Sequence, residues 1–265
     1  MRQTTVAGQF YPLSPRILKK ELARYFSDLD VSPRNVIGAV VPHAGYIYSG
    51  GVAANAYAVL PQAETFILLG PNHTGFGSAV AVSQEIWATP LGEIETDVEL
   101  ARSLAGTILD YDETAHRYEH SIEVQLPFLK YRFKGGFKIL PICLGLQDEE
   151  TAVEVGNEIA RAVKECGRKV VIIASSDLTH YQPANIAQAI DHYLIESILD
   201  MDVPELYRRI AERGASACGY GPISAMLTAA VSLGAKKANL LKYATSADVT
   251  GDTSAVVGYS AIVVE

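Results

Sequence analysis

The sequence has little cysteine, no block of positive charge and no long apolar run, and each shortage excludes a class of protein. Three cysteines in 265 residues are too few and too scattered for a disulfide framework or a Cys-x-x-Cys zinc site. Twenty-two Lys and Arg against 30 Asp and Glu give a net charge of −8, which argues against nucleic acid or an anionic membrane surface as a partner. No apolar stretch approaches the roughly 20 residues of a membrane-spanning helix, and the polar N-terminal segment does not resemble a secretion signal. We therefore expect a cytoplasmic protein.

The apolar residues, which are 49% of the chain, fall into two alternating patterns. Short runs rich in β-branched residues predict buried strands at 36–41, 66–69, 138–144, 170–174 and 255–264. Helical periodicity and end signals predict helices that start at 15, 96 and 148, and others at 186–199, 204–212 and 224–233. No linker or repeat interrupts the pattern. It therefore predicts one α/β domain over residues 1–265, in which helices flank a mixed or mostly parallel central sheet.

Three of the six histidines follow predicted strands closely. His43, His73 and His180 come within a few residues of the first, second and fourth of these strands. Ligands of such sheets bind beyond the carboxyl ends of the strands. A single histidine there is commonly a hydrogen-bonded loop residue, but three at equivalent ends favour a metal site, because neutral imidazole is the commonest protein ligand for zinc, copper and non-haem iron.

A third metal ligand has two candidates. Asp177 lies on the same loop as His180 and could bind a metal or orient a histidine. Cys218 lies among glycines that lead into a predicted helix, where the helix dipole would stabilise a thiolate. Cys143 lies inside an apolar strand and Cys166 near a helix end, so both are interpreted as packing residues.

The segment from His116 to His120 offers a competing interpretation. It matches the H-x-x-E-H pattern of inverted zinc peptidases, which needs both histidines on one helical face and Glu119 as the general base. The preceding residues have no helical apolar stripe, and Pro127 is expected to cut the following segment short, so we reject the peptidase hypothesis. His120 and Glu123 remain candidates for the wall of a pocket. The sequence lacks a G-x-S-x-G elbow, a Walker loop and a G-x-G-x-x-G turn after a strand, so nucleotide chemistry is not supported.

Six motifs occur in an order that resembles a known family. They are Val6–Pro12, Val41–Gly50, Leu69–His73, Glu119–Glu123, Ser175–Tyr181 and Ser246–Asp252. Together they closely resemble the Memo family, also described as the B protein of the AmmeMemoRadiSam system. The resemblance covers essentially the whole chain.

The resemblance implies a fold similar to that of LigB-like class III extradiol dioxygenases, which use non-haem Fe(II). It makes His43, His73 and Cys218 the metal ligands, with Fe(II) as the favoured ion and copper or zinc as alternatives. Asp177 and His180 match catalytic residues of the pocket, and His180 stands where the dioxygenases keep an acid/base histidine. Phe10 replaces a tryptophan of the animal Memo proteins. The further pocket residues implied are His120, Glu123, Phe10, Tyr46 and Asn72.

Two functions follow from this resemblance. The first is an O₂-dependent oxidoreductase that acts on an unknown small molecule, with the metal activating oxygen. The second is a metal-binding or redox protein without turnover, which works with AMMECR1-like and radical-SAM proteins. The thiolate supports the second function, because it is softer than carboxylate, favours copper or zinc, and is itself oxidisable.

Overall fold

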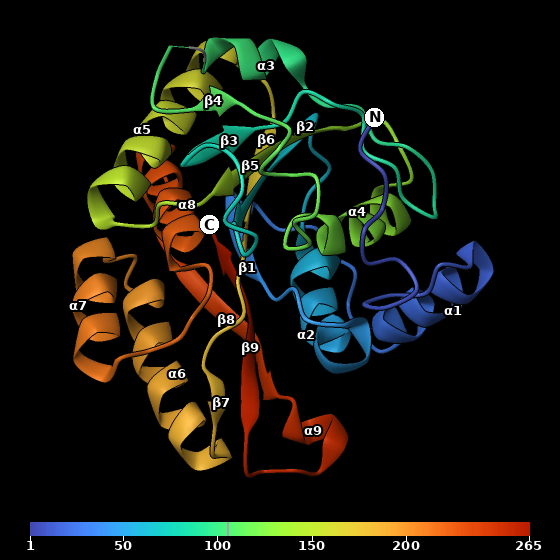
Figure 1. Cartoon of the computed structure of the whole chain (residues 1–265), viewed down its shortest axis with the longest axis vertical. Helices are drawn as coiled ribbons and strands as arrows, with labels where there is room; N and C mark the ends of the chain where they lie inside the picture. The colour runs from blue at the N-terminus through green and yellow to red at the C-terminus, as the bar shows by residue number, and fades with distance from the viewer. Residues whose placement is uncertain (105) are drawn as a thin grey trace.

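The computed structural model describes residues 1–104 and 106–265 and contains a nine-stranded sheet covered by helices on both faces (Figure 1). The strands are β1 (Gly38–Val41), β2 (Thr65–Pro71), β3 (Val80–Val82), β4 (Asp110–Tyr111), β5 (Lys138–Leu144), β6 (Val170–Ser175), β7 (His180–Gln182), β8 (Ala238–Thr245) and β9 (Val256–Val264). Their order is β4-β3-β5-β2-β6-β1-β9-β7, and β8 pairs with β9.

The middle of the sheet is parallel and its flanks are antiparallel. β5, β2, β6 and β1 run in one direction, whereas β3 runs antiparallel to β5 and β9 runs antiparallel to β1. Every residue of β1 and β2 is buried, as expected of strands with helices on both sides. The predicted α/β fold with a mixed, mostly parallel sheet is therefore confirmed.

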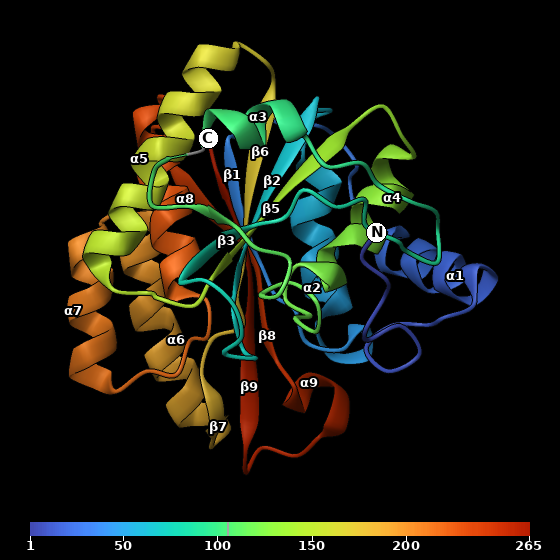
Figure 2. The same ribbon diagram turned by 45° about the horizontal axis from the view of Figure 1, so that its top comes forward.

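The helices form two layers. One face is covered by α1 (Pro15–Phe26), α2 (Tyr46–Val59) and, after the 3₁₀ turn η1 (Glu123–Gln125), α4 (Leu126–Phe133). The other is covered by α3 (Val98–Ser103), α5 (Glu149–Cys166), α6 (Ala184–Leu199), α7 (Val203–Arg213) and α8 (Tyr220–Ser232). Figure 2 shows the sheet between these layers, and the short α9 (Ala247–Thr250) next to β8 and β9.

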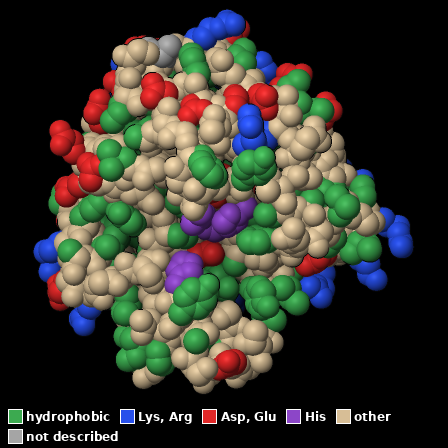
Figure 3. All heavy atoms as spheres, viewed as in Figure 1, with side chains coloured by type: hydrophobic (Ala, Val, Ile, Leu, Met, Phe, Trp, Pro, Cys, Tyr) green, Lys and Arg blue, Asp and Glu red, His purple; other side chains and the backbone are tan. Residues whose placement is uncertain are grey.

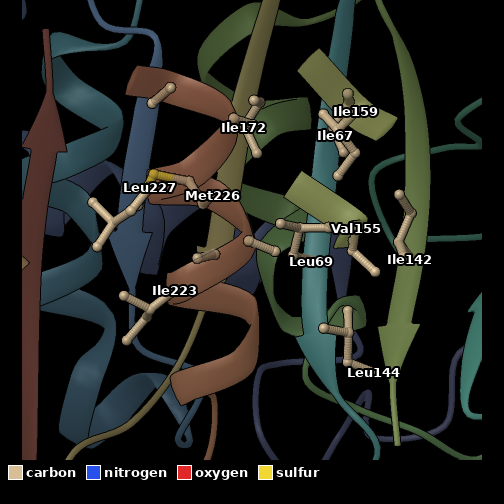
Figure 4. Close-up of a cluster of buried hydrophobic side chains, with 14 of the residues drawn as sticks. Ile67, Leu69, Ile142, Leu144, Val155, Ile159, Ile172, Ile223, Met226 and Leu227 are labelled. Carbon is tan, nitrogen blue, oxygen red and sulfur yellow. The ribbon is translucent and has the colours of Figure 1, made fainter. Parts of the chain in front are cut away.

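The core on the second face is built where α5 and α8 meet the sheet. Figure 4 shows Val155 and Ile159 of α5 over β2 and β5, with Met226 of α8 next to β6. The two helices approach closely at Gly156, since a Cβ there would lie 2.6 Å from the carbonyl oxygen of Ala225. This packing holds α8, whose first turn follows Cys218, firmly against the sheet.

Several local predictions are confirmed and two are wrong. Asp148 caps α5 by accepting a hydrogen bond from the Thr151 amide, and Gly167 ends the helix in the left-handed conformation. The helix predicted to start at 96 begins at Val98 and is capped by Asp97, whereas the Thr96 hydroxyl donates to the carbonyl of Glu85.

Pro127 was expected to cut a segment short, but it lies in the first turn of α4, where a missing amide costs nothing. The helix α2 was not predicted. It is apolar all round, with ten of its 14 residues buried, and so lacks an amphipathic pattern.

Candidate metal centre

The ends of three parallel strands bring the candidate ligands together. β1 and β2 are both hydrogen-bonded to β6, so the three strands end at the same edge of the sheet. His43 follows β1 and His73 follows β2, and Cys218 lies just before α8. One ligand atom each of His43, His73 and Cys218 lies within 4.8 Å of the other two. Figure 3 shows histidine side chains gathered near the middle of one face of the molecule, beside acidic and hydrophobic side chains.

Hydrogen bonds fix the proton of the His43 ring. Its Nδ1 lies 2.9 Å from the Ser175 hydroxyl, whose single proton is donated to the carbonyl of Ser121 at 2.7 Å. His43 must therefore donate from Nδ1, which leaves the lone pair on Nε2. That nitrogen lies 3.2 Å from the Sγ atom of Cys218.

Buried residues of the core hold the Ser175 hydroxyl in place. The side-chain amide of Gln125 donates to Ser175 and to the carbonyl of Pro42, and its oxygen accepts from the Tyr57 hydroxyl at 2.9 Å. All these groups are buried. The chain of bonds from α2 through η1 to β6 thus sets the tautomer of His43 before any ligand binds.

His73 is oriented by Glu119 in the same way. The Nδ1 atom of His73 donates to the Glu119 carboxylate at 2.9 Å, which leaves Nε2 with its lone pair. Although burial raises the pKa of a carboxyl, hydrogen bonds from His73 and from the Ser121 amide lower the pKa of Glu119 to about 2. The backbone amides of His73, His120 and Ser121 donate to the same group, so its oxygens are already occupied. These bonds make Glu119 a positioning residue for His73, although one ligand atom each of His73, Glu119 and His120 also lies within 4.8 Å of the other two.

Cys218 is held by the loop that follows β6. Its amide donates to the carbonyl of Asp177, and the Asp177 amide donates to its Sγ atom at 3.3 Å. Burial, together with the neighbouring Asp177 charge, raises the pKa of the Cys218 thiol well above its usual range. The expected stabilisation of a thiolate by the helix dipole is therefore outweighed by burial. Only a cation beside the sulfur would remove its proton near neutral pH.

Asp177 and His180 flank these ligands. The carboxylate of Asp177 accepts the backbone amide of His43 at 2.8 Å, and burial raises the pKa of Asp177 to about 6. The Nδ1 atom of His180 donates to the carbonyl of Ser216 at 3.0 Å, which leaves its Nε2 lone pair available. His180 is partly exposed, so a molecule from solvent can reach it.

His120 completes a group of three imidazoles. Its ring stacks on His73, with centroids 4.7 Å apart, and meets His43 edge to face at 5.5 Å. Phe10 packs on the other side, 4.9 Å from the His120 centroid. Burial lowers the pKa of His120, which favours its neutral form. Phe10 and His120 therefore lie next to the candidate ligands, and their role as pocket residues stays a prediction.

Three other predicted pocket residues have different surroundings. Glu123 is buried in an ion pair with Arg2 at 2.6 Å and holds down the N-terminal segment. The Tyr46 hydroxyl donates to the carbonyl of Val124 in the core. The Asn72 side chain accepts the amides of residues 74 and 75, so it shapes the loop that carries His73.

The residue that sequence reasoning missed is Glu119, which was considered only as a peptidase base. The 116–120 segment is not helical, and His116 is buried with its Nε2 atom 3.1 Å from the Ala81 carbonyl. The rejection of the peptidase pattern is consistent with this geometry. A carboxylate next to a candidate histidine was the available signal for Glu119.

Among the described residues, no helix combines the length and apolar character needed to cross a membrane.

Comparisons with known proteins identify the fold and the family of the chain. A crystal structure of an uncharacterized protein from Escherichia coli K12 superposes with a TM-score of 0.56 at 12% identity, covering 86% of this chain and 99% of that one, and so shows the fold alone.

Relatives of much higher identity cover the full length. A MEMO1 family protein of Methanococcoides burtonii is 64% identical over all 265 residues of this chain and 100% of its own length, and one of Methanosarcina barkeri is 63% identical over the same shares. A third, from Archaeoglobus fulgidus, is 51% identical over 99% of both chains. The family model for Memo-like proteins matches residues 2–263. The chain therefore belongs to the Memo family.

Proposed function

We propose that this protein is a metalloprotein whose ion is held by the Nε2 atoms of His43 and His73 and the Sγ atom of Cys218. One observation carries the proposal: the three ligand atoms lie together while the second nitrogen of each imidazole is already bonded to Ser175 or Glu119. Metal-binding histidines characteristically donate their other N–H in this manner. A purely structural histidine cluster has no need of two imidazole lone pairs left free beside a thiol.

We propose Fe(II) as the ion. Two imidazoles with one anionic ligand leave open positions of the kind that non-haem iron enzymes use. Copper and zinc are the competing ions, because a thiolate binds both well. One of the three proposed ligands is sulfur, so metal analysis has to decide between Fe(II) and these two ions.

The activity that this centre suits best is an O₂-dependent oxidation of a small molecule, as in the LigB-like dioxygenases that the family resembles. A bound metal would supply activation of O₂. The protein itself would orient the substrate against the packed rings of Phe10 and His120 and exclude water with these rings. His180, with a free Nε2 lone pair, would accept or return the substrate proton, and Asp177 would hold the backbone of His43.

A second function, metal binding without turnover, is favoured by the thiol itself. An oxidisable sulfur 3.2 Å from a histidine nitrogen is vulnerable in an enzyme that handles O₂. In this case AMMECR1-like or radical-SAM proteins would be the partners, and the protein would carry or sense a metal for them.

The test starts with metal content. Protein purified under anaerobic conditions with Fe(II) should hold about one ion per chain, and Cys218→Ser should lower the occupancy severalfold by replacing a thiolate with a neutral hydroxyl. Cys166→Ser is the matched control, because this thiol lies at the end of α5, where it donates to the Val163 carbonyl. Equal metal content in all three proteins would contradict the ligand set.

Oxygen uptake then separates the two functions. Uptake that depends on an added catechol-type or enolisable compound and disappears in His43→Ala would support the enzyme. A metal-loaded protein that consumes no oxygen with any compound of a broad panel would instead support the binding function.

A further inference from the structure

A groove of about 590 Å³ lies between α1 and the last turn of α4. Its apolar wall is formed by Phe26, Val31, Leu91 and Tyr131. The Phe26 and Tyr131 rings stack with centroids 5.5 Å apart, and Val31 is 41% exposed. The volume of the groove falls within the range typical of small-molecule sites.

The groove is separate from the metal centre. α4 follows η1, which lies next to the histidines, and its last turn leads toward Lys138, the first residue of β5. Since Lys138 pairs with Thr65 at the start of β2, that turn lies toward the opposite edge of the sheet from His43 and His73. A ligand in the groove would therefore not touch the proposed metal ligands.

Four cationic side chains complete the lining: Lys19, Lys130, Arg132 and Lys134. Within residues 1–104 and 106–265, none of them forms an ion pair, although the chain carries an excess of eight acidic residues. Asp28 and Asp30 precede Val31, but neither lines the groove. Figure 3 shows Lys and Arg side chains along the edge of the molecule over α1. An uncompensated positive rim around an apolar wall is complementary to an anion that has an apolar body.

Arg132 has no anionic partner among the described residues. Its guanidinium lies over the Phe133 ring, 5.2 Å from the centroid. Its Nε atom is shielded, so the Nη atoms, which make no hydrogen bond to the described residues, are the ones that a ligand in the groove can reach. A carboxylate or phosphate oxygen is the acceptor that a guanidinium binds best.

We propose that this groove binds an amphiphilic anion, an apolar chain or ring that carries a carboxylate or phosphate group. The apolar part packs on Tyr131, Leu91 and Val31, and the acidic group pairs with Arg132 and the surrounding lysines. A single small anion without an apolar part would leave the wall uncovered, and a neutral hydrocarbon would leave the four cationic side chains without an anion.

Calorimetric titration of the full-length protein tests this, with dodecanoate and dodecyl phosphate as probes below their micelle-forming concentrations. Both should bind, and whichever binds more tightly identifies the head group. Hexanoate should bind about 60-fold more weakly than dodecanoate if half of the six missing methylenes are buried, since one buried methylene is worth a factor of about four. Dodecyltrimethylammonium, which has the same chain and the opposite charge, should not bind. Failure of both anions, or equal binding of the cationic probe, would overturn the proposal.

Variants locate the binding. Arg132→Gln and Lys19→Gln should each weaken dodecanoate binding about tenfold. Lys20→Gln, one residue along α1 and outside the groove, is the matched control and should bind as the parent does. Val31→Asp, at an exposed position, tests the apolar wall with little risk to folding. Binding should persist in His43→Ala, which separates this result from the fate of the metal centre. If dodecanoate binding is the same in all groove variants, the groove is not its site.

Discussion

Single residues at the proposed metal centre derive their chemistry from the groups that hold them. His43 presents its lone pair on Nε2 because its Nδ1–H donates to Ser175, and His73 does so because its Nδ1–H donates to Glu119. Neither partner is close in sequence to the imidazole it orients. The ability of each histidine to bind a metal therefore depends on its packed neighbours as much as on its being a histidine.

Ser175→Ala tests this dependence. The substitution removes the acceptor of the His43 proton, so the ring is free to rotate or change tautomer. We expect the affinity for Fe(II), measured by competition with a chelator, to fall 10- to 100-fold. Stability should fall by about 1–3 kcal/mol, because Gln125 and the Ser121 carbonyl lose a buried partner.

The control is Ser103→Ala, whose hydroxyl donates to the Leu100 carbonyl in α3, far from the centre. It should leave metal affinity unchanged. Unchanged affinity in Ser175→Ala as well would mean that the tautomer of His43 is set by another group.

At the scale of whole elements, the position of Cys218 depends on how α8 packs on α5. Gly156→Ala would place a Cβ in contact with both the Ala225 carbonyl and the Thr228 side chain, each at 2.6 Å. Alanine gains about 1 kcal/mol of helix propensity, but forced separation of the helices costs about 1–3 kcal/mol. We expect net destabilisation, measured by urea unfolding.

Gly51→Ala is the matched control in α2. Its Cβ would meet only Tyr25, at an ordinary 3.8 Å, and the residue is exposed. This variant should be as stable as the parent or more so. Stabilisation by Gly156→Ala would show that α5 and α8 have room to move apart.

The cap of α3 gives a pH-dependent test. Asp97 accepts bonds from the Thr65 hydroxyl and the Leu100 amide and pairs with Arg168 at 3.0 Å. Burial alone raises its pKa, but these partners outweigh burial and lower the pKa of Asp97 below its usual value. A depressed pKa stabilises the fold above the unfolded value of about 3.9, and the contribution is lost as pH falls through the folded pKa.

Asp97→Asn should therefore lower the free energy of unfolding by about 1–3 kcal/mol at pH 7. The difference between the two proteins should shrink below about pH 4. Unfolding by urea at pH 7 and at pH 3.5 measures both values. A difference that is the same at both pH values would mean that the carboxylate charge does not contribute.

For the molecule as a whole, the proposed metal centre joins segments that are far apart in the chain. His43, His73 and Cys218 come from the ends of β1 and β2 and from the start of α8. An ion bound only by the folded state should raise its stability by about 2.7 kcal/mol at a free concentration 100 times the dissociation constant.

Thermal unfolding with and without Fe(II) under anaerobic conditions measures this gain. The rise in Tm should disappear in His73→Ala, which changes a loop residue and leaves the core intact. A metal-dependent rise that survives in this variant would place the ion elsewhere.

The sequence by itself determined the central strands and the residues at their ends. Five strands are buried on both faces: β1, β2, β5, β6 and β9. A strand buried in this way has a continuous apolar sequence, which is the pattern that predicted them. Because parallel strands end at one edge, His43 and His73 were predicted to meet.

Only the tertiary structure decided the rest. Three strands, β3, β4 and β7, are only two or three residues long and form because they pair with neighbouring strands. The sequence does not reveal α2, because neighbours bury this helix on nearly every side and it has no amphipathic pattern. Glu119 and Ser175 acquire their roles from partners 46 and 132 residues away. Local patterns record burial and turn chemistry, whereas hydrogen bonds between distant segments exist only after the chain has packed.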